Sequence, residues 1–362
     1  MPDCSSAGSA CHSGPAPIQI LELTCDQLTA EFGRRYGKGH YHAAAVYREV
    51  FRRPAPDLQA VDALARSPEL VDRLAGELDA APGAVVAEQA EGDLVKLIIR
   101  LQDGLDIETV VIPMARHTTV CISCQVGCRM GCRFCETGQM GFYRHLTAAE
   151  IVGQVYTARV VRGLAVKNVV FMGMGEPFDN FDNVVQAVRV LSDQRGLSIA
   201  PRHITISTAG RIDGIRRLAR LNGPRPHLAV SLNASNDLLR SAIMPINRTV
   251  PMARLRDALR AYPLSAKDTF LIEYVLIKGV NDRRQHAREL AEFLKPLPVR
   301  INLIPYNPRA QSPYRPPLPA DVDRFRDWLV AEKVFVRLRS TKGRSITAAC
   351  GQLGRDRGGP PA

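Results

Sequence analysis

The sequence contains no apolar stretch that approaches the roughly 18 residues of a membrane-spanning helix. Cysteine is scarce, since nine residues in 362 are too few for a disulfide scaffold. The opening "MPDCSSAGSACHSGPAP" has neither a basic flank nor an apolar core, so we expect no secretory signal there. We expect a disordered tail of small residues over 1–17 and a cytoplasmic protein that does not bind membranes.

Acidic residues are outnumbered by basic ones. The chain has 36 aspartates and glutamates against 48 lysines and arginines, which gives a formal net charge of +12. A surplus of this size favours a polyanionic partner, most simply nucleic acid. An arginine-rich proteome would give the same surplus without such a partner, so both interpretations stay open. Hydrophobic residues at 46% and charged residues at 23% are ordinary values for a globular protein.

Residues 18–90 are predicted to form a small helical domain. Its clearest helix covers 40–53, where apolar residues recur at helical spacing and prolines follow at positions 54 and 56. After it, "GDLVKLIIRLQDGLDIETVVIP" predicts two strands around a Gln-Asp-Gly turn. Residues 91–115 are therefore expected to form a hairpin that bridges into the next domain.

From residue 116 the pattern changes to strand, loop and helix, repeated. Thr147 and Glu150 are spaced as a capping box at the start of one such helix, and a last helix and strand are expected over 320–332 and 333–340. Strands that alternate with helices indicate parallel βαβ units. The sequence predicts an α/β fold in which 116–345 form a partial (β/α)6 barrel, with its site at the carboxyl ends of the strands.

Five cysteines lie within fifteen residues, and the last three have the spacing C-x3-C-x2-C in "CRMGCRFC". In a reducing compartment, clustered thiols bind metal or perform chemistry more often than they form disulfides. Structural zinc is one alternative, but the seven residues between Cys124 and Cys132 make a short loop for two zinc-binding pairs. A ferredoxin-like electron carrier is another, but it needs a fourth thiolate, commonly followed by proline. Three thiolates on a cubane leave one iron open, which indicates a site that binds a reacting molecule.

The spacing C-x3-C-x2-C, with Phe134 before its last cysteine, resembles the radical S-adenosylmethionine (SAM) superfamily. Over residues 20–354 the chain further resembles the RlmN/Cfr family of RNA adenine methyltransferases, and more closely its RlmN branch. The stretches that carry this resemblance are "CISCQVGCRMGCRFCETGQMGFYRHLTAAEI", "VVFMGMGEPFDN", "ITISTAG", "AVSLNASNDLLRSAIMPIN", "IEYVLIKGVND", "NLIPYNP" and "AACGQL".

The resemblance implies a radical SAM barrel, one [4Fe–4S] cluster and SAM as cofactors. It implies methylation of adenosine C2 in 23S rRNA, with tRNA as a further target and Cfr-like methylation of C8 as the alternative. RNA would then be gripped by the N-terminal helical domain and by arginine-rich faces. A reducing donor such as flavodoxin or ferredoxin would supply electrons, and we expect a monomer.

Site residues also follow from the resemblance. Cys128, Cys132 and Cys135 would ligate the cluster. Cys350, in the C-terminal segment predicted over 346–362, would carry the methyl group, and Cys121 would be the resolving thiol. Glu108 matches the residue that accepts a proton. The expected SAM contacts are Gly175, Glu176, Ser207, Ser231, Leu232, Asn233 and Asn307.

Four features depart from the family pattern. Cys124 stands where serine or threonine is usual, and no role is assigned to it. Asn233 replaces a histidine, and Thr347 replaces an aspartate just before "AACGQL". The stretch "CETGQMG" replaces the usual "CATA" or "CSTA". These changes leave the expected catalytic set in place and leave the RNA target open.

Overall fold

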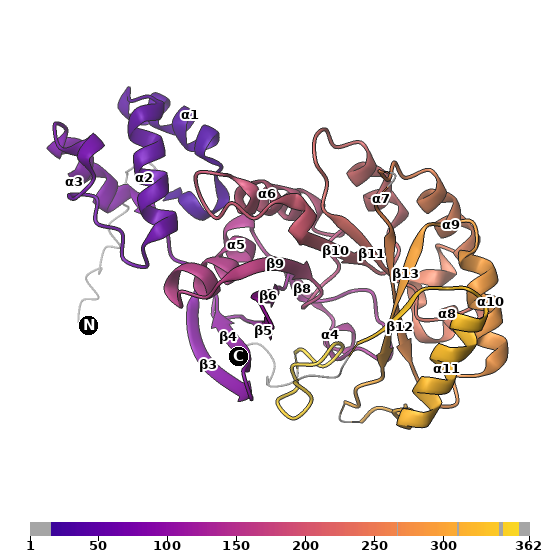
Figure 1. The fold of residues 1–362 in the computed structure, drawn as a ribbon. Coiled ribbons are helices and arrows are strands. Elements are labelled where there is room, and N and C mark those ends of the chain that lie inside the picture. Colours follow the sequence, from indigo (N-terminus) through magenta and orange to yellow (C-terminus); the bar gives the residue numbers. More distant parts are fainter. Residues whose placement is uncertain (1–15, 266, 310, 340–342, 355–362) are drawn as a thin grey trace, which may run out of the picture.

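The computed structural model describes residues 16–265, 267–309, 311–339 and 343–354. A group of N-terminal helices lies beside a strongly curved sheet, with further helices on the outside of that sheet (Figure 1). The tail predicted over 1–17 lies outside the described residues except for Ala16 and Pro17, and so does the part of 346–362 that follows residue 354.

The N-terminal part is built from three helices and a two-stranded parallel sheet. The elements are β1 (Ile18–Gln19), α1 (Cys25–Tyr36), α2 (His40–Arg52), α3 (Pro68–Glu77) and β2 (Leu78–Asp79). The helix predicted over 40–53 is α2, and it ends just before Pro54 because the residue preceding a proline disfavours the helical conformation. Contacts hold these helices against the barrel, since the Tyr156 hydroxyl donates to the Val50 carbonyl at 3.0 Å.

One sheet of ten strands forms the body of the molecule. Its spatial order is β14-β13-β12-β11-β10-β9-β6-β5-β4-β3. The antiparallel strands are β3 (Ala84–Glu91), β4 (Leu94–Arg100), β5 (Asp106–Met114) and β6 (His117–Cys121), and from β6 onward each pairing is parallel. The parallel strands that follow are β9 (Val166–Phe171), β10 (Ile204–Thr208), β11 (His227–Ser231), β12 (Phe270–Leu276), β13 (Val299–Pro305) and β14 (Val336–Leu338).

The predicted α/β fold with a partial barrel is confirmed. Helices separate most of the parallel strands: α5 (Ala148–Tyr156), α6 (Phe181–Ser192), α7 (Ile212–Ala219), α8 (Asp237–Ile243), α9 (Met252–Arg260), α10 (Arg284–Leu294) and α11 (Pro319–Ala331). The capping box of Thr147 and Glu150 is present at the start of α5. Each strand therefore delivers its carboxyl end to the same rim, as parallel βαβ units require.

Strand β3 differs from the prediction, because residues 84–90 were expected within a helical region. Its side chains are mostly exposed, so its sequence "AVVAEQAE" shows no apolar alternation of the kind that marks a half-buried strand. The strand is stabilised by its backbone pairing with β4, which runs from Ala84 opposite Arg100 to Glu91 opposite Leu94. The predicted hairpin over 91–115 thus belongs to a larger antiparallel extension of the sheet.

Candidate active site

The cysteine loop begins where β6 ends. It continues through β7 (Gln125–Gly127) and α4 (Glu136–Gln139) to β8 (Phe142–His145), which pairs with β7. The Cys128 backbone N–H donates to the Gly141 carbonyl at 2.7 Å, and the Arg133 N–H donates to the Ile243 carbonyl at 2.9 Å. These bonds fix the loop across the mouth of the barrel.

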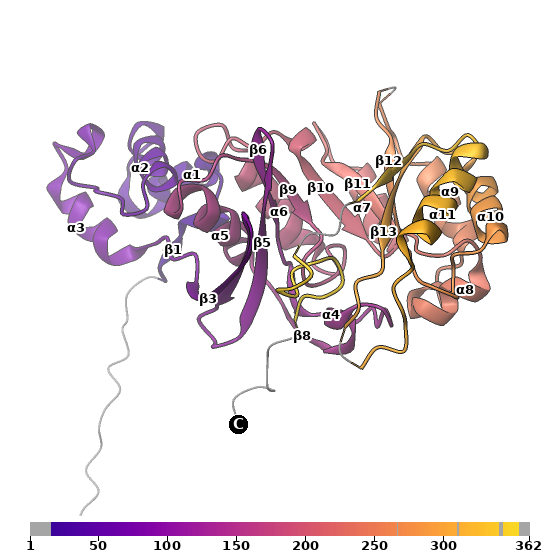
Figure 2. The same ribbon diagram turned by 60° about the horizontal axis from the view of Figure 1, so that its bottom comes forward.

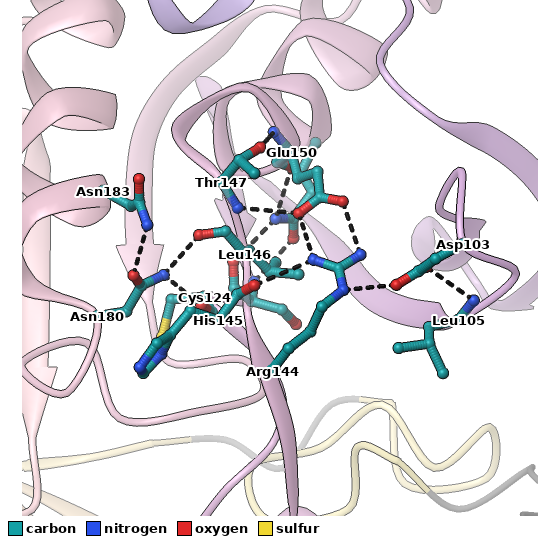
Figure 3. Close-up of polar contacts among 12 residues, drawn as sticks. Asp103, Leu105, Cys124, Arg144, His145, Leu146, Thr147, Glu150, Asn180 and Asn183 are labelled. Carbon is teal, nitrogen blue, oxygen red and sulfur yellow. Dashed lines mark hydrogen bonds and ion pairs between the residues drawn. The ribbon is translucent and has the colours of Figure 1, made fainter. Parts of the chain in front are cut away.

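A network of polar side chains supports this loop from beneath (Figure 3). The Arg144 guanidinium joins Asp103 at 2.6 Å to Glu150 at 2.8 Å. The Asn180 amide donates to the carbonyls of Cys124 and Leu146, at 2.8 and 2.7 Å. The loop is therefore held by a turn of the hairpin, by the start of α5 and by the start of α6.

Cys128, Cys132 and Cys135 line one cavity, here called the central cavity. Burial raises the pKa of the Cys128 thiol to about 12, and burial also raises the pKa values of Cys132 and Cys135. In the described residues, no group of three or more histidine, cysteine, aspartate or glutamate side chains is arranged to hold a single metal ion. The three thiols instead share a cavity with residues from the middle of β12 and from the ends of β9, β10 and β11 or the loops after them, which are Gly175, Glu176, Ser207, Ser231, Asn233 and Glu273.

Gly175 and its neighbour Gly173 let the backbone pass close to the cysteine loop. Gly175 has a φ of 105°, and a Cβ atom there would lie 2.6 Å from the Cβ of Gln125. A Cβ on Gly173 would lie 2.6 Å from the Ile122 carbonyl oxygen. Both positions require glycine, which explains the motif "MGMGEP" after β9.

Glu176 is buried beside the central cavity and already accepts hydrogen bonds from the protein. The Thr208 hydroxyl donates to Oε1 and the Ala209 N–H donates to Oε2, both at 2.7 Å. Burial raises the pKa of this carboxyl to about 7, although these hydrogen bonds lower it. A carboxylate has about four acceptor positions, so the group retains acceptor capacity toward a donor in the cavity.

Asn233 fixes the turn that follows β11. It has a φ of 59°, in the left-handed region that asparagine tolerates better than most residues. Its side-chain oxygen accepts from the Val275 N–H at 2.9 Å, and its own carbonyl accepts from Asn281 at 2.8 Å. Leu232, the neighbouring predicted SAM contact, is buried in the main core, and it is not among the described residues that line the central cavity.

A second cavity, here called the outer cavity, adjoins the first. Polar and thiol side chains in its lining are Thr119, Cys121, Asn307, Arg337, Arg339 and Cys350. Both cavities are lined by Met172, Ile304 and Cys350. Cys350 therefore lies on the boundary between the two cavities, with the three clustered thiols on one side and Cys121 on the other.

Cys350 belongs to residues 343–354, here called the C-terminal segment, which lies between the antiparallel strands and α4 (Figure 2). The Cys350 carbonyl accepts from the Asn307 amide at 3.2 Å, and the Glu136 N–H donates to the Gly351 carbonyl at 2.7 Å. The residue is accessible because it faces the cavities. The surrounding protein still raises the pKa of the Cys350 thiol by desolvation, and the charge of Glu273 raises it further.

Cys121 is buried on β6, with its thiol facing the outer cavity. Burial raises the pKa of this thiol to about 12, and the nearby charge of Cys350 raises it further. Arg339 lowers the pKa values of both thiols. The structure thus brings the two cysteines together, although 229 residues separate them in the sequence (350 − 121).

Glu108 lies outside both linings, beneath the C-terminal segment. It is buried on β5, and its Oε2 atom lies 3.7 Å from the Nζ atom of Lys96 on β4. Among the described residues that line the two cavities, Glu108 does not occur. Its carboxylate is thus adjacent to the segment that carries Cys350.

Three residues of this region were not anticipated from the sequence: Lys96, Glu273 and Arg339. Glu273 is buried, accepts a hydrogen bond from Asn302 at 2.7 Å, and has a pKa that burial raises. The sequence does mark Glu273, because it is the one charged residue in the strand "FLIEYVL", and such a residue indicates a functional site. Cys124, in contrast, packs its side chain into the main core, where burial raises the pKa of its thiol well above the usual value.

The described residues fit the cofactors that the cysteine spacing indicates. Three thiols converge on one cavity that also has polar strand ends, and the buried Asn307 Oδ1 atom has no hydrogen-bond partner among the described residues. A buried acceptor left without a protein donor is normally satisfied by a ligand or by water.

Comparison with known proteins identifies the superfamily. The sequence profile of the Radical SAM superfamily matches residues 122–294, from the end of β6 to the end of α10. Fold and site together define a radical SAM protein, and this membership implies a [4Fe–4S] cluster and SAM as its cofactors.

Relatives along the whole chain identify the family. The probable dual-specificity RNA methyltransferase RlmN 1 of Protochlamydia amoebophila is 42% identical over 93% of this chain and 94% of its own length. The dual-specificity RNA methyltransferase RlmN of Geobacter sulfurreducens is 41% identical over 93% of this chain and 92% of its own length. The chain belongs to the RlmN family, which confirms the resemblance seen in the sequence.

A solved structure supports the same conclusion. The crystal structure of a radical SAM methyltransferase from Sphaerobacter thermophilus is 40% identical in sequence and superimposes with a TM-score of 0.86. The match covers 94% of this chain and 99% of that one. The N-terminal helices and the antiparallel strands therefore fall within the shared fold.

Proposed function

We propose that this protein is a radical SAM RNA methyltransferase that methylates C2 of an adenosine in 23S rRNA, with tRNA as a further substrate. The observation that carries the proposal is the place of Cys350, on the boundary between the cavity of the clustered thiols and the cavity of Cys121. The relatives named as dual-specificity RNA methyltransferases support RNA as the substrate.

The chemistry of the target explains why iron is needed. Adenine C2 is a C–H carbon between two nitrogens, so it does not attack a methyl sulfonium as an amine or a thiolate would. The bound cofactors would supply a carbon radical by one-electron reductive cleavage of SAM. We assign Cys128, Cys132 and Cys135 to the cluster. Residues assigned to SAM are Gly175, Glu176, Ser207, Ser231, Leu232, Asn233 and Asn307.

In this proposal two cysteines handle the methyl group. The Cys350 sulfur would carry a methyl group supplied by SAM, with S-adenosylhomocysteine as the leaving product. Once a hydrogen atom has been taken from that methyl group, its carbon would bond to C2 of the base, and the unpaired electron left on the adduct would return to the cluster or its electron donor. Glu108 would accept the C2 proton; it lies beneath the C-terminal segment and lines neither cavity, so this role requires the segment to shift when RNA binds. Cys121 then attacks the Cys350 sulfur and releases the methylated RNA, which leaves a Cys121–Cys350 disulfide that a thiol reductant must reopen. All cysteines of the described residues are free thiols, as a transient disulfide allows.

The outer cavity would receive the target base. Arg337 and Arg339 offer positive charge at its edge, and Cys121 lies within it, so a base held there would lie next to both cysteines. The N-terminal helical domain over 18–90 and the arginine-rich faces would grip further phosphates. This assignment fits the net charge of +12.

The proposal also covers the electron donor, the oligomeric state and the cellular location of the enzyme. Flavodoxin or ferredoxin would supply the electrons, because reductive cleavage needs a donor of low potential. We propose that the protein acts as a monomer. Clustered thiols and an RNA substrate favour the cytoplasm. Among the described residues, no helix is long and apolar enough to cross a membrane.

The direct test is mass spectrometry of nucleosides from RNA treated anaerobically with reconstituted protein, SAM and reductant. We expect 2-methyladenosine together with released 5′-deoxyadenosine. Finding 8-methyladenosine instead would favour the Cfr-like alternative. An absence of both methylated nucleosides on rRNA and tRNA, despite release of 5′-deoxyadenosine, would reject RNA adenine methylation.

A further inference from the structure

The β3–β4 hairpin holds the C-terminal segment at two points. The Glu91 carboxylate accepts from the Gly343 N–H at 2.7 Å and from the Ser345 N–H at 2.8 Å. Further along the segment, the Lys96 ammonium donates to the Thr347 hydroxyl at 2.8 Å. Thr347 lies three residues before Cys350. The position of Cys350 therefore depends on this hairpin as well as on the barrel.

Lys96 differs from Glu91 because it also contacts Glu108. Lys96 pairs with Val110 and Ile98 pairs with Glu108, so the two charged residues are diagonal neighbours on one face of the sheet. The C-terminal segment covers that face, and the Lys96 side chain is completely buried. One ammonium group thus contacts both Glu108 and the segment that carries Cys350.

We propose that Lys96 is a positioning residue that holds Glu108 as a carboxylate and fixes it relative to the methyl-carrying segment. The inference rests on the proposed function, because it assigns Lys96 a part in the step that Glu108 serves. Lys96 lies outside the stretches that carry the family resemblance. Its part follows from the two contacts made by one buried ammonium.

The electrostatic reason is that a neighbouring opposite charge favours the charged form of a buried carboxylate. The Lys96 ammonium, 3.7 Å away, provides that charge. Thr347 accepts a hydrogen bond from the same ammonium, which ties the C-terminal segment to the residue that holds Glu108.

The test compares Lys96→Met with the wild-type holoenzyme on the same RNA. Because cofactor cleavage precedes the step that Glu108 serves, we expect 5′-deoxyadenosine release within about twofold of wild type. Formation of 2-methyladenosine should be lower by about tenfold or more, toward the roughly 10²- to 10⁴-fold that a positioned base contributes. The covalent protein–RNA adduct should persist, and a denaturing gel would show it.

Glu91→Ala is the matched control, because it frees the same segment without touching Glu108. Hydrogen exchange over 343–354 should rise in both Glu91→Ala and Lys96→Met. Only Lys96→Met should retain the covalent adduct.

A double-mutant cycle separates positioning from simple structural support. If Lys96 acts through Glu108, Lys96→Met/Glu108→Gln should form product no more slowly than Glu108→Gln alone. The double variant also removes the uncompensated carboxylate, so it keeps the test available if Lys96→Met fails to fold. Additive losses in the cycle, or clean release of RNA by Lys96→Met, would overturn the inference. Wild-type protein that makes no 2-methyladenosine would instead reject the proposed function.

Discussion

At the scale of single residues, the site depends on two thiols that share one boundary. Cys350 faces both cavities and Cys121 faces the outer one, so the proposed methyl transfer and release need no large displacement of either residue. Both thiols have raised pKa values through burial, and Arg339 lowers them again. Arg339 therefore favours the thiolate forms that the proposed reactions of both cysteines require.

The resolving role can be tested by Cys121→Ala. We expect this variant to cleave SAM and to add to the base, and then to remain covalently attached to RNA because no thiol releases it. A labelled RNA that migrates with the protein on a denaturing gel is the measurement.

Cys124→Ala is the control for that experiment. Cys124 is equally buried and only three residues away, but its side chain packs into the main core. We expect Cys124→Ala to release RNA as the wild type does. Free RNA from Cys121→Ala, with turnover intact, would be incompatible with the resolving role.

The sequence anticipated residues that a local pattern marks and missed those that only the fold brings together. The spacing of Cys128, Cys132 and Cys135 is local, so the shared cavity could be predicted. The contact of Lys96 with Thr347 joins positions 251 apart, and no periodicity encodes such a pair. Cys121 and Cys350 are also far apart in the sequence, so no local pattern pairs them, and only the family resemblance led us to expect that they act together.

At the scale of elements, the parallel strands were predictable and the edge strand was not. Strands β9 to β13 are short segments rich in Val, Ile, Leu and Phe that alternate with helical segments, which is the pattern of parallel βαβ units. Strand β3 is exposed along most of its length, so only its partner β4 defines it. Yet this edge hairpin carries both Glu91 and Lys96, which hold the C-terminal segment.

The grip of Glu91 on that segment should depend on pH. Hydrogen bonds from Ser345 and Gly343 lower the pKa of Glu91 below its ordinary value of 4.5. A lowered pKa in the folded state means that the grip is complete above pH 4.5 and is lost as the pH falls through the folded-state value. We expect hydrogen exchange over 343–354, corrected for intrinsic rate, to accelerate in that acidic range.

Glu91→Gln is the control, because a glutamine side chain carries no charge and does not titrate in this acidic range. Its exchange over 343–354 should already be faster than wild type at pH 7 and should show little further acceleration on acidification. Identical pH dependence in Glu91→Gln and wild type would show that Glu91 does not hold the segment.

At the scale of the whole molecule, the positive charge predicts how RNA binding responds to salt. Each phosphate contact releases counterions, so affinity should fall steeply as salt increases. Arg337→Gln, at the edge of the outer cavity, should reduce the slope of log affinity against log salt by about 0.7 to 0.9. Filter binding across a salt series would measure it.

Lys295→Gln is the matched control for that slope. Lys295 follows α10 on the outer side of the barrel and has 76% of its side chain exposed. Lys295→Gln removes one positive charge, as Arg337→Gln does, but at a place away from both cavities. We therefore expect the slope of log affinity against log salt to stay at its wild-type value. Equal slopes for all three proteins would place the RNA elsewhere.

The order in which the chain is made gives the C-terminal segment one more consequence. The β3–β4 hairpin leaves the ribosome more than 240 residues before Gly343 and Ser345, which dock on it. A polypeptide halted just before residue 343 would own every cysteine of the C-x3-C-x2-C motif yet have no carrier sulfur. Under the proposed function, such a fragment has no sulfur to carry the methyl group, and we expect nucleoside mass spectrometry to find no methylated adenosine from it.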